Sequence, residues 1–187
     1  MKVDNSIQAL VSLVDDPDES IFTQVKQELI KYGVAAIPYL EKSWADDLFG
    51  KIHQTRIEKL IKDINFEETK RQLIKWVDSP EKDLLDGEII ISKFKSPDLK
   101  TKNIYTYFDE LKRDIWLEIN NNQTAFEKIK IINRILFDHH GFKGNKSDYS
   151  APINSYIHNV IDRKKGNPLS LSLVYSILAQ ALEVPVY

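Results

Sequence analysis

Apolar residues recur at helical spacing along almost the whole chain, and this periodicity limits the fold more than any other feature of the sequence. Side chains three and four positions apart lie on one face of a helix, so each apolar stripe predicts an amphipathic helix with one face to bury. The sequence therefore predicts a mainly α protein. The expected stripes and helices cover residues 7–14, 17–32, 37–44, 48–63, 66–77, 82–94, 104–115, 126–136 and 168–182.

Capping residues set the boundaries of the second of these helices. Asp16 followed by Pro17 predicts a helix start, and Gly33 predicts the stop of the same helix. Another helix follows at once with Pro38 near its beginning, so residues 17–46 resemble one hairpin of a HEAT repeat. A single HEAT hairpin cannot bury a core, and the chain shows no convincing second copy. We therefore expect this hairpin to pack on neighbouring helices.

The second half of the chain carries two further capping signals. Thr124 and Glu127 predict a capping box, and Gly141 predicts the end of the helix that this box begins. Asn167 and Pro168 predict the N-cap and the first position of the last helix.

Large apolar side chains on these stripes are expected in the core. The expected core residues are Ile37, Leu40, Trp44, Trp76, Ile104, Phe108, Leu111, Ile115, Trp116, Phe126, Ile129, Ile132, Leu136, Leu171, Tyr175, Leu178 and Leu182.

Composition excludes several classes of function. Apolar residues make up 42% and charged residues 29% of the chain, as in ordinary folded proteins. The formal net charge of −2 lacks the positive field that non-specific nucleic-acid binding needs. No apolar run approaches the ~20 residues of a membrane span, and with no Cys there is no thiolate site for a metal. We expect a cytoplasmic protein that binds neither nucleic acid nor membrane and uses no cofactor.

A polar segment of unusual length separates the last two long stripes. Residues 141–155 are rich in Gly, Ser, Asn and Pro, and loops of this length in compact domains are often functional. Polar and aromatic groups flank this loop and the start of the last helix. They could line a cleft for a peptide segment or a small polar ligand, or they could hold the loop through hydrogen bonds to its backbone. The residues are Asn145, Tyr149, Asn154, Tyr156, Arg163, Asn167 and Ser170.

The C-terminal third resembles the transglutaminase-like superfamily. Three pieces carry this resemblance: GFKGN at 141–145, the triplet at 154–156 and GNPLSLS from Gly166. The chain is more narrowly similar to the SirB-type family, in which a helical N-terminal region precedes the core. The resemblance implies a helical region at 1–98 and, at 99–187, the helical half of an α+β, papain-like core whose sheet is missing.

The resemblance also implies where catalysis would occur. Enzymes of this superfamily carry a Cys at the start of the core helix, where free N–H groups and the helix dipole stabilise a thiolate. A His and an acidic residue on the following strands complete a triad. The corresponding nucleophile position here is Pro168, and the last histidine of the chain, His158, precedes the helix. We expect no thiol catalysis, a vestigial nucleophile position at Pro168, and a chain that is a fragment of a longer protein.

Two other candidates for chemistry have structural alternatives. Ser170 or Ser172 could replace the thiol, but a serine needs a positioned base, and hydroxyls in a first helical turn commonly bond to the backbone. His139 and His140 suggest a metal pair, but adjacent helical side chains point about 100° apart. No carboxylate at favourable sequence spacing completes a site. We predict no metal site, with the two histidines complementing the negative end of a helix dipole.

The sequence thus favours a non-catalytic transglutaminase-like protein that binds another protein or a peptide, or regulates one. Some animal relatives of the family are joined to an F-box, an adaptor arrangement that favours interaction. Two alternatives stay open. One is a hydrolase or acyl transferase that uses residues outside this chain, and the other is a plain helical scaffold.

Overall fold

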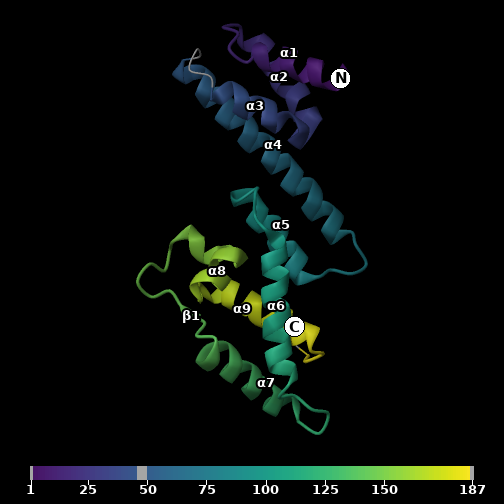
Figure 1. The fold of residues 1–187 in the computed structure, drawn as a ribbon, viewed down its shortest axis with the longest axis vertical. Helices are drawn as coiled ribbons and strands as arrows, with labels where there is room; N and C mark the ends of the chain where they lie inside the picture. Colours follow the sequence, from purple (N-terminus) through teal and green to yellow (C-terminus); the bar gives the residue numbers. More distant parts are fainter. Residues whose placement is uncertain (1, 46–49, 186–187) are drawn as a thin grey trace. The chain divides into compact units, whose positions relative to one another are not determined.

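The computed structural model describes residues 2–45 and 50–185, and helix dominates this part of the chain (Figure 1). The mainly α prediction is confirmed. The α-helices are α1 (Lys2–Ser12), α2 (Glu19–Tyr32), α3 (Ile37–Trp44), α4 (Lys51–Val77), α5 (Leu84–Lys95), α6 (Thr101–Trp116), α7 (Ala125–Asn133), α8 (Ile157–Arg163) and α9 (Pro168–Ala181). The other elements are the 3-10 helices η1 (Gly33–Ala36) and η3 (Pro152–Ser155), the π-helical turn η2 (Arg134–His139), and the strands β1 (Lys143–Gly144) and β2 (Lys165–Gly166). None of the described helices combines the length and apolar character that crossing a bilayer demands.

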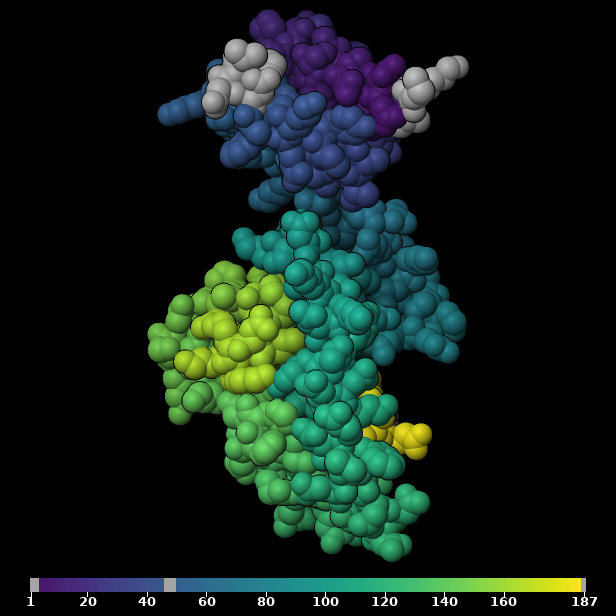
Figure 2. Space-filling view, viewed as in Figure 1, coloured from purple at the N-terminus to yellow at the C-terminus, as the bar shows by residue number. Residues whose placement is uncertain are grey.

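The chain packs as two compact units, residues 1–75 and residues 76–187. Helix α5 belongs to the second unit because Leu85 and Ile89 lie in its core, although the family resemblance groups this helix with residues 1–98. In the space-filling view the segments from α6 to α9 form one closely packed body (Figure 2). The predicted division into residues 1–98 and 99–187 is inferred from the family resemblance and not from packing. It therefore stays a prediction.

The first unit is built around one core, to which α1, α2, α3 and the first half of α4 all contribute. Helices α2 and α3 form the expected hairpin through η1, and Gly33 ends α2 with a φ of 61°. The predicted start of α2 is wrong by two residues. Asp18 is the N-cap and accepts a hydrogen bond from the Ser20 N–H at 2.8 Å, whereas the Asp16 carboxylate accepts one from the Asp18 N–H. Similarity of this hairpin to a HEAT repeat stays a prediction.

Helix α4 is continuous, which corrects the two separate helices expected at 48–63 and 66–77. No Gly or Pro interrupts residues 51–77, so the backbone has no reason to break where the apolar stripe changes phase. The buried side chains His53, Ile57, Leu60 and Ile64 all lie in its first half. Leu48, where the first of these helices was expected to begin, lies outside the described residues.

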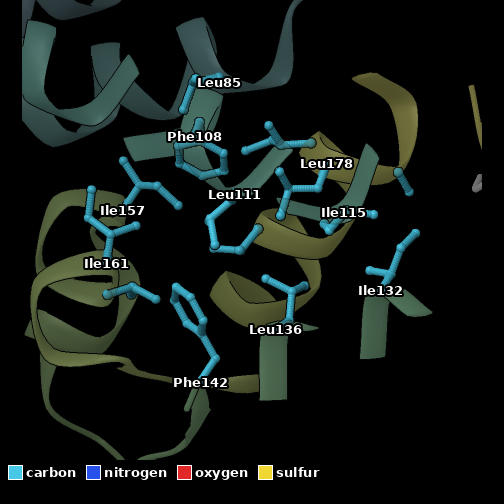
Figure 3. Close-up of a cluster of buried hydrophobic side chains, with 14 of the residues drawn as sticks. Leu85, Phe108, Leu111, Ile115, Ile132, Leu136, Phe142, Ile157, Ile161 and Leu178 are labelled. Atoms are coloured by element: carbon cyan, nitrogen blue, oxygen red, sulfur yellow. The ribbon is translucent and has the colours of Figure 1, made fainter. Parts of the chain in front are cut away.

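The second unit has a core formed mainly by α6, α7 with η2, α8 and α9. Figure 3 shows Leu111 of α6 in the middle of this cluster, with Ile157 of α8 on one side and Leu178 of α9 on the other. The predicted stripe of α6 is confirmed in full, because its four apolar residues are each at most 4% exposed. Helix α9 buries Val174, Ile177, Leu178 and Ala179, while the expected residues Leu171, Tyr175 and Leu182 pack partly buried at the edge.

Several large aromatic side chains predicted in the core are instead on the surface. Trp116 is 64% exposed because it follows the buried Ile115 and so points about 100° away from the core face of α6. Phe126 is also 64% exposed, and the Lys130 ammonium lies 4.5 Å from its ring centroid. Trp44 is 42% exposed, and its indole N–H donates to Glu58 at 3.1 Å. Periodicity located these helices, but it did not determine which neighbour covers each turn.

The third tryptophan, Trp76, packs directly on a glycine of α5. A Cβ added at Gly87 would lie 2.9 Å from the Trp76 ring, closer than such atoms can approach. The ring cannot simply move away, because its indole N–H donates to the Asp83 carbonyl at 2.7 Å. Gly87 therefore stands inside a helix to allow this contact.

We predict that Gly87→Ala lowers the free energy of unfolding by about 1 kcal/mol in urea denaturation. Overpacking costs about 1–3 kcal/mol, whereas alanine inside a helix gains about 1 kcal/mol over glycine. In a Trp76→Ala background the clash is absent, so the same change should become stabilising. Stabilisation by Gly87→Ala in the wild-type background would contradict the contact.

Candidate functional site

The start of α9 is closed by a reciprocal cap. The Asn167 side chain accepts a hydrogen bond from the Ser170 N–H at 2.9 Å, and the Ser170 hydroxyl accepts one from the Asn167 N–H at 3.1 Å. Pro168 occupies the first helical position, where its missing N–H costs nothing. The N-cap and the helix start predicted from the sequence are both confirmed.

The Ser170 hydroxyl is a structural group in this arrangement. Ser170 is only 2% exposed, and its hydroxyl donates to the Asn154 carbonyl at 2.6 Å. A hydroxyl has one proton to donate, so this short bond keeps the group turned toward the loop backbone. Ser172, the other serine considered as a replacement for the thiol, is exposed on the same helix.

Gly166 lets the chain approach Ser170 this closely. A Cβ at Gly166 would lie 2.5 Å from the Ser170 hydroxyl oxygen and 3.2 Å from Leu171 Cγ. Strand β2, which contains Gly166, pairs in parallel with β1. The Asn145 N–H donates to the Gly166 carbonyl at 3.0 Å, so the same short segment ties the long loop to the helix start.

Two buried asparagines organise the loop that precedes α8. The Asn145 amide donates to the Asn154 side-chain oxygen at 2.9 Å, and the Asn154 amide donates to the carbonyls of Asp148 at 2.7 Å and Tyr149 at 3.1 Å. Both asparagines are at most 2% exposed. These bonds tie the two buried side chains to carbonyls of the loop backbone, so residues 145–154 have a defined path.

An open pocket of about 430 Å³ lies beside this network at the start of α9. The loop contributes Tyr149, Pro152 and Ser155, and the helix start contributes Asn167, Pro168 and Leu169. Tyr149 is 63% and Leu169 is 68% exposed. The Asn167 amide donates to the Ser155 hydroxyl at 2.9 Å. The pocket thus combines exposed apolar groups with uncharged polar ones.

The structure brings most of the predicted site residues to this place, in two layers. Asn145, Asn154 and Ser170 lie buried and hold the loop, whereas Tyr149 and Asn167 line the pocket with Pro168. Tyr156 and Arg163 are not among the lining residues. The Tyr156 ring lies 6.1 Å from that of His158, and Arg163 ends α8.

Sequence reasoning missed Leu169 and Ser155. The one signal for Leu169 in the sequence is that this apolar residue lies outside the apolar stripe of its own helix.

A second polar group lies between α6, η2 and the end of α8. The Lys164 ammonium donates to the Tyr107 hydroxyl and lies 3.7 Å from the centroid of the same ring. Burial, with the charges of Glu110 and Asp114, raises the pKa of Tyr107 to about 12. Burial also lowers the pKa of Lys164. Lys164 adopts a backbone φ of 55°. Residues other than glycine rarely take such a value, so this packing holds an unusual backbone conformation.

The paired histidines belong to this second group. His140 Nε2 lies 3.0 Å from an Asp114 carboxylate oxygen, and Asp114, His139 and His140 each place one ligand atom within 4.8 Å of the others. A carboxylate from a distant position in the chain thus lies beside the two histidines, where the sequence spacing offered none. Asp114 comes from α6, 25 positions before His139 in the chain, so no local spacing could reveal it.

We predict that Ser170→Ala lowers the free energy of unfolding by about 1–3 kcal/mol. It removes half of the capping box and the short bond to the buried Asn154 carbonyl, which then keeps only the longer contact from the Asn167 N–H at 3.4 Å. Ser172→Ala is the matched control in the same helix and should change stability by less than about 0.5 kcal/mol. Thermal or urea denaturation measures both. Equal effects of the two changes would show that the Ser170 hydroxyl has no special structural role.

Residues 102–187 match the family model described as "Transglutaminase-like superfamily". A UPF0162 protein of Xylella fastidiosa is 29% identical over 110 residues, which cover 59% of this chain and 39% of that protein. F-box only protein 21 of Mus musculus is 46% identical over 55 residues, covering 29% of this chain and 9% of that protein. A UPF0162 protein of Vibrio cholerae is 22% identical over 104 residues, covering 56% and 38%.

The matched part of the chain spans about two fifths of the length of the bacterial relatives and about a tenth of the mouse protein. No solved structure matches the chain significantly. The comparisons support the transglutaminase-like superfamily for residues 102–187, the part of the chain that contains the capped start of α9 and its pocket.

Proposed function

We propose that the second unit is a binding module without thiol chemistry, and that the pocket at the start of α9 receives an extended segment of another protein. The observation that carries this proposal is the pairing of an open pocket with Pro168 at the position where the superfamily resemblance implies a nucleophile. Proline has neither a reactive group nor a backbone N–H to offer an oxyanion. Such a site would keep the pocket that contacts another molecule and lack only the reactive group.

The chemistry of the pocket favours a peptide over other partners. None of the described residues that line it carries a charge, so it has no group that would neutralise a phosphate. Its exposed Tyr149 and Leu169 offer apolar contact, while Ser155 and Asn167 offer hydrogen bonds. An extended peptide presents apolar side chains and backbone polar groups together, which fits this mixture.

The name of one relative supports the proposal of an interaction role. One relative is a mouse protein named for an F-box, an arrangement that the family resemblance associates with adaptors. We extend that reasoning to this chain as part of the proposal. A cytoplasmic location and a regulatory role remain predictions from the sequence.

The enzymatic alternative draws on the superfamily match. It would require Ser170 or another group to act with residues outside this chain. The bond from the Ser170 hydroxyl to the Asn154 carbonyl weighs against Ser170, because a nucleophilic hydroxyl must be free to donate to a general base.

Selection of displayed random peptides on the immobilised chain tests the proposal. We expect the selected peptides to carry apolar residues at alternating positions, and synthetic versions to bind in fluorescence anisotropy. Leu169→Asn should weaken that binding by at least about tenfold, because burying a leucine side chain contributes about 1.5–3 kcal/mol and tenfold corresponds to about 1.4 kcal/mol.

Leu117→Asn is the matched control, since Leu117 and Leu169 are each 68% exposed in the same unit. It should leave peptide binding unchanged. A selection that yields no peptide, or equal weakening by the two substitutions, would overturn the proposed site.

A further inference from the structure

Two histidines and an aspartate from separate elements meet on the second unit, away from the pocket at α9. Asp114 lies in the last turn of α6, His139 ends the π-helical turn η2, and His140 is the cap that follows. The His140 N–H donates to the carbonyl of Ile135 at 2.9 Å, five positions earlier. In this wider turn, the angle about the helix axis between successive side chains is smaller than in an α-helix. The two imidazole rings have centroids 5.0 Å apart and are nearly perpendicular.

We propose that Asp114, His139 and His140 form a binding site for a divalent transition-metal ion of the Zn²⁺ class. Neutral imidazole nitrogens and a carboxylate oxygen are the donors that suit Zn²⁺ and its neighbours, and Mg²⁺ or Ca²⁺ would prefer oxygen ligands alone. Three protein ligands leave a fourth position of a tetrahedral ion for water or another ligand. This site is independent of the proposed peptide pocket.

The distances suit an ion after a small adjustment. Ligand atoms bound to one tetrahedral ion at about 2.0–2.1 Å lie roughly 3.3 Å apart. Asp114 Oδ2 and His140 Nε2 are already 3.0 Å apart, and all three ligand atoms lie within 4.8 Å of one another. His139 is exposed, so its ring is the part of the site that can rotate inward.

Neighbouring groups orient His140 for this role. The Tyr107 hydroxyl lies 3.5 Å from His140 Nδ1 and directs the other ring nitrogen, Nε2, toward Asp114. Contacts of this kind to the second nitrogen set the orientation of metal-binding histidines. The Arg113 guanidinium lies 3.9 Å from Oδ1 of Asp114, so its charge faces the carboxylate oxygen that is not turned to His140.

Isothermal titration with Zn²⁺ alone, on the chain without a polyhistidine tag, tests the site. We expect one ion per chain, with at least about tenfold weaker binding for each of His139→Ala, His140→Ala and Asp114→Asn. Co²⁺ in place of Zn²⁺ should give the visible absorption of a tetrahedral site in the wild-type chain, and that absorption should be lost in the same variants.

Asp109→Asn is the control, because Asp109 is an exposed aspartate of the same helix outside the cluster. It should leave Zn²⁺ affinity unchanged. His139→Ala removes an exposed side chain, so this variant should fold as the wild type does by circular dichroism and gives a clear reading. Absence of Zn²⁺ binding, or equal affinity of wild type and a folded His139→Ala variant, would overturn the site.

Discussion

The contact between Ser170 and the Asn154 carbonyl is the interaction on which the order of the C-terminal unit around α9 depends. It joins the first turn of α9 to the end of the long loop at 2.6 Å. Gly166 is required there because any side chain would occupy the space of the hydroxyl. The buried asparagine pair then extends the same hydrogen-bonded network back to β1. A loop that the sequence marks as mostly polar thereby gains a single path, because its backbone groups have partners.

The same network divides the residues of this site into a buried group and an exposed group. The groups that could have been reactive or ligand-binding by residue type, Ser170 and Asn154, are buried and bonded to one another. Pro168, Leu169 and Tyr149 instead line the open pocket at the surface, together with Ser150, Ser155 and Asn167. Residues 102–187 match the model of the transglutaminase-like superfamily, and similarity of this kind does not by itself imply the superfamily's reaction.

Much of the fold could be predicted because helix formation leaves local signals. The stripe of α6, the capping box of Thr124 and Glu127 and the start of α9 follow from residues within a few positions of one another. The errors have a common cause. Helical spacing alone predicts Trp116 and Phe126 in the core and divides α4 where its apolar phase changes, although neighbouring elements decide which turns are covered.

By itself the sequence determined the helical class and the capped helix start at Asn167, because each is a property of adjacent residues. That Pro168 stands at a nucleophile position is what the family resemblance implies. Tertiary structure alone decided that Asn145 and Asn154 support the loop while Leu169 reaches the pocket, and that Asp114 meets His140. These pairings join residues from different elements. Their distances depend on how the helices pack, which no local pattern of residues specifies.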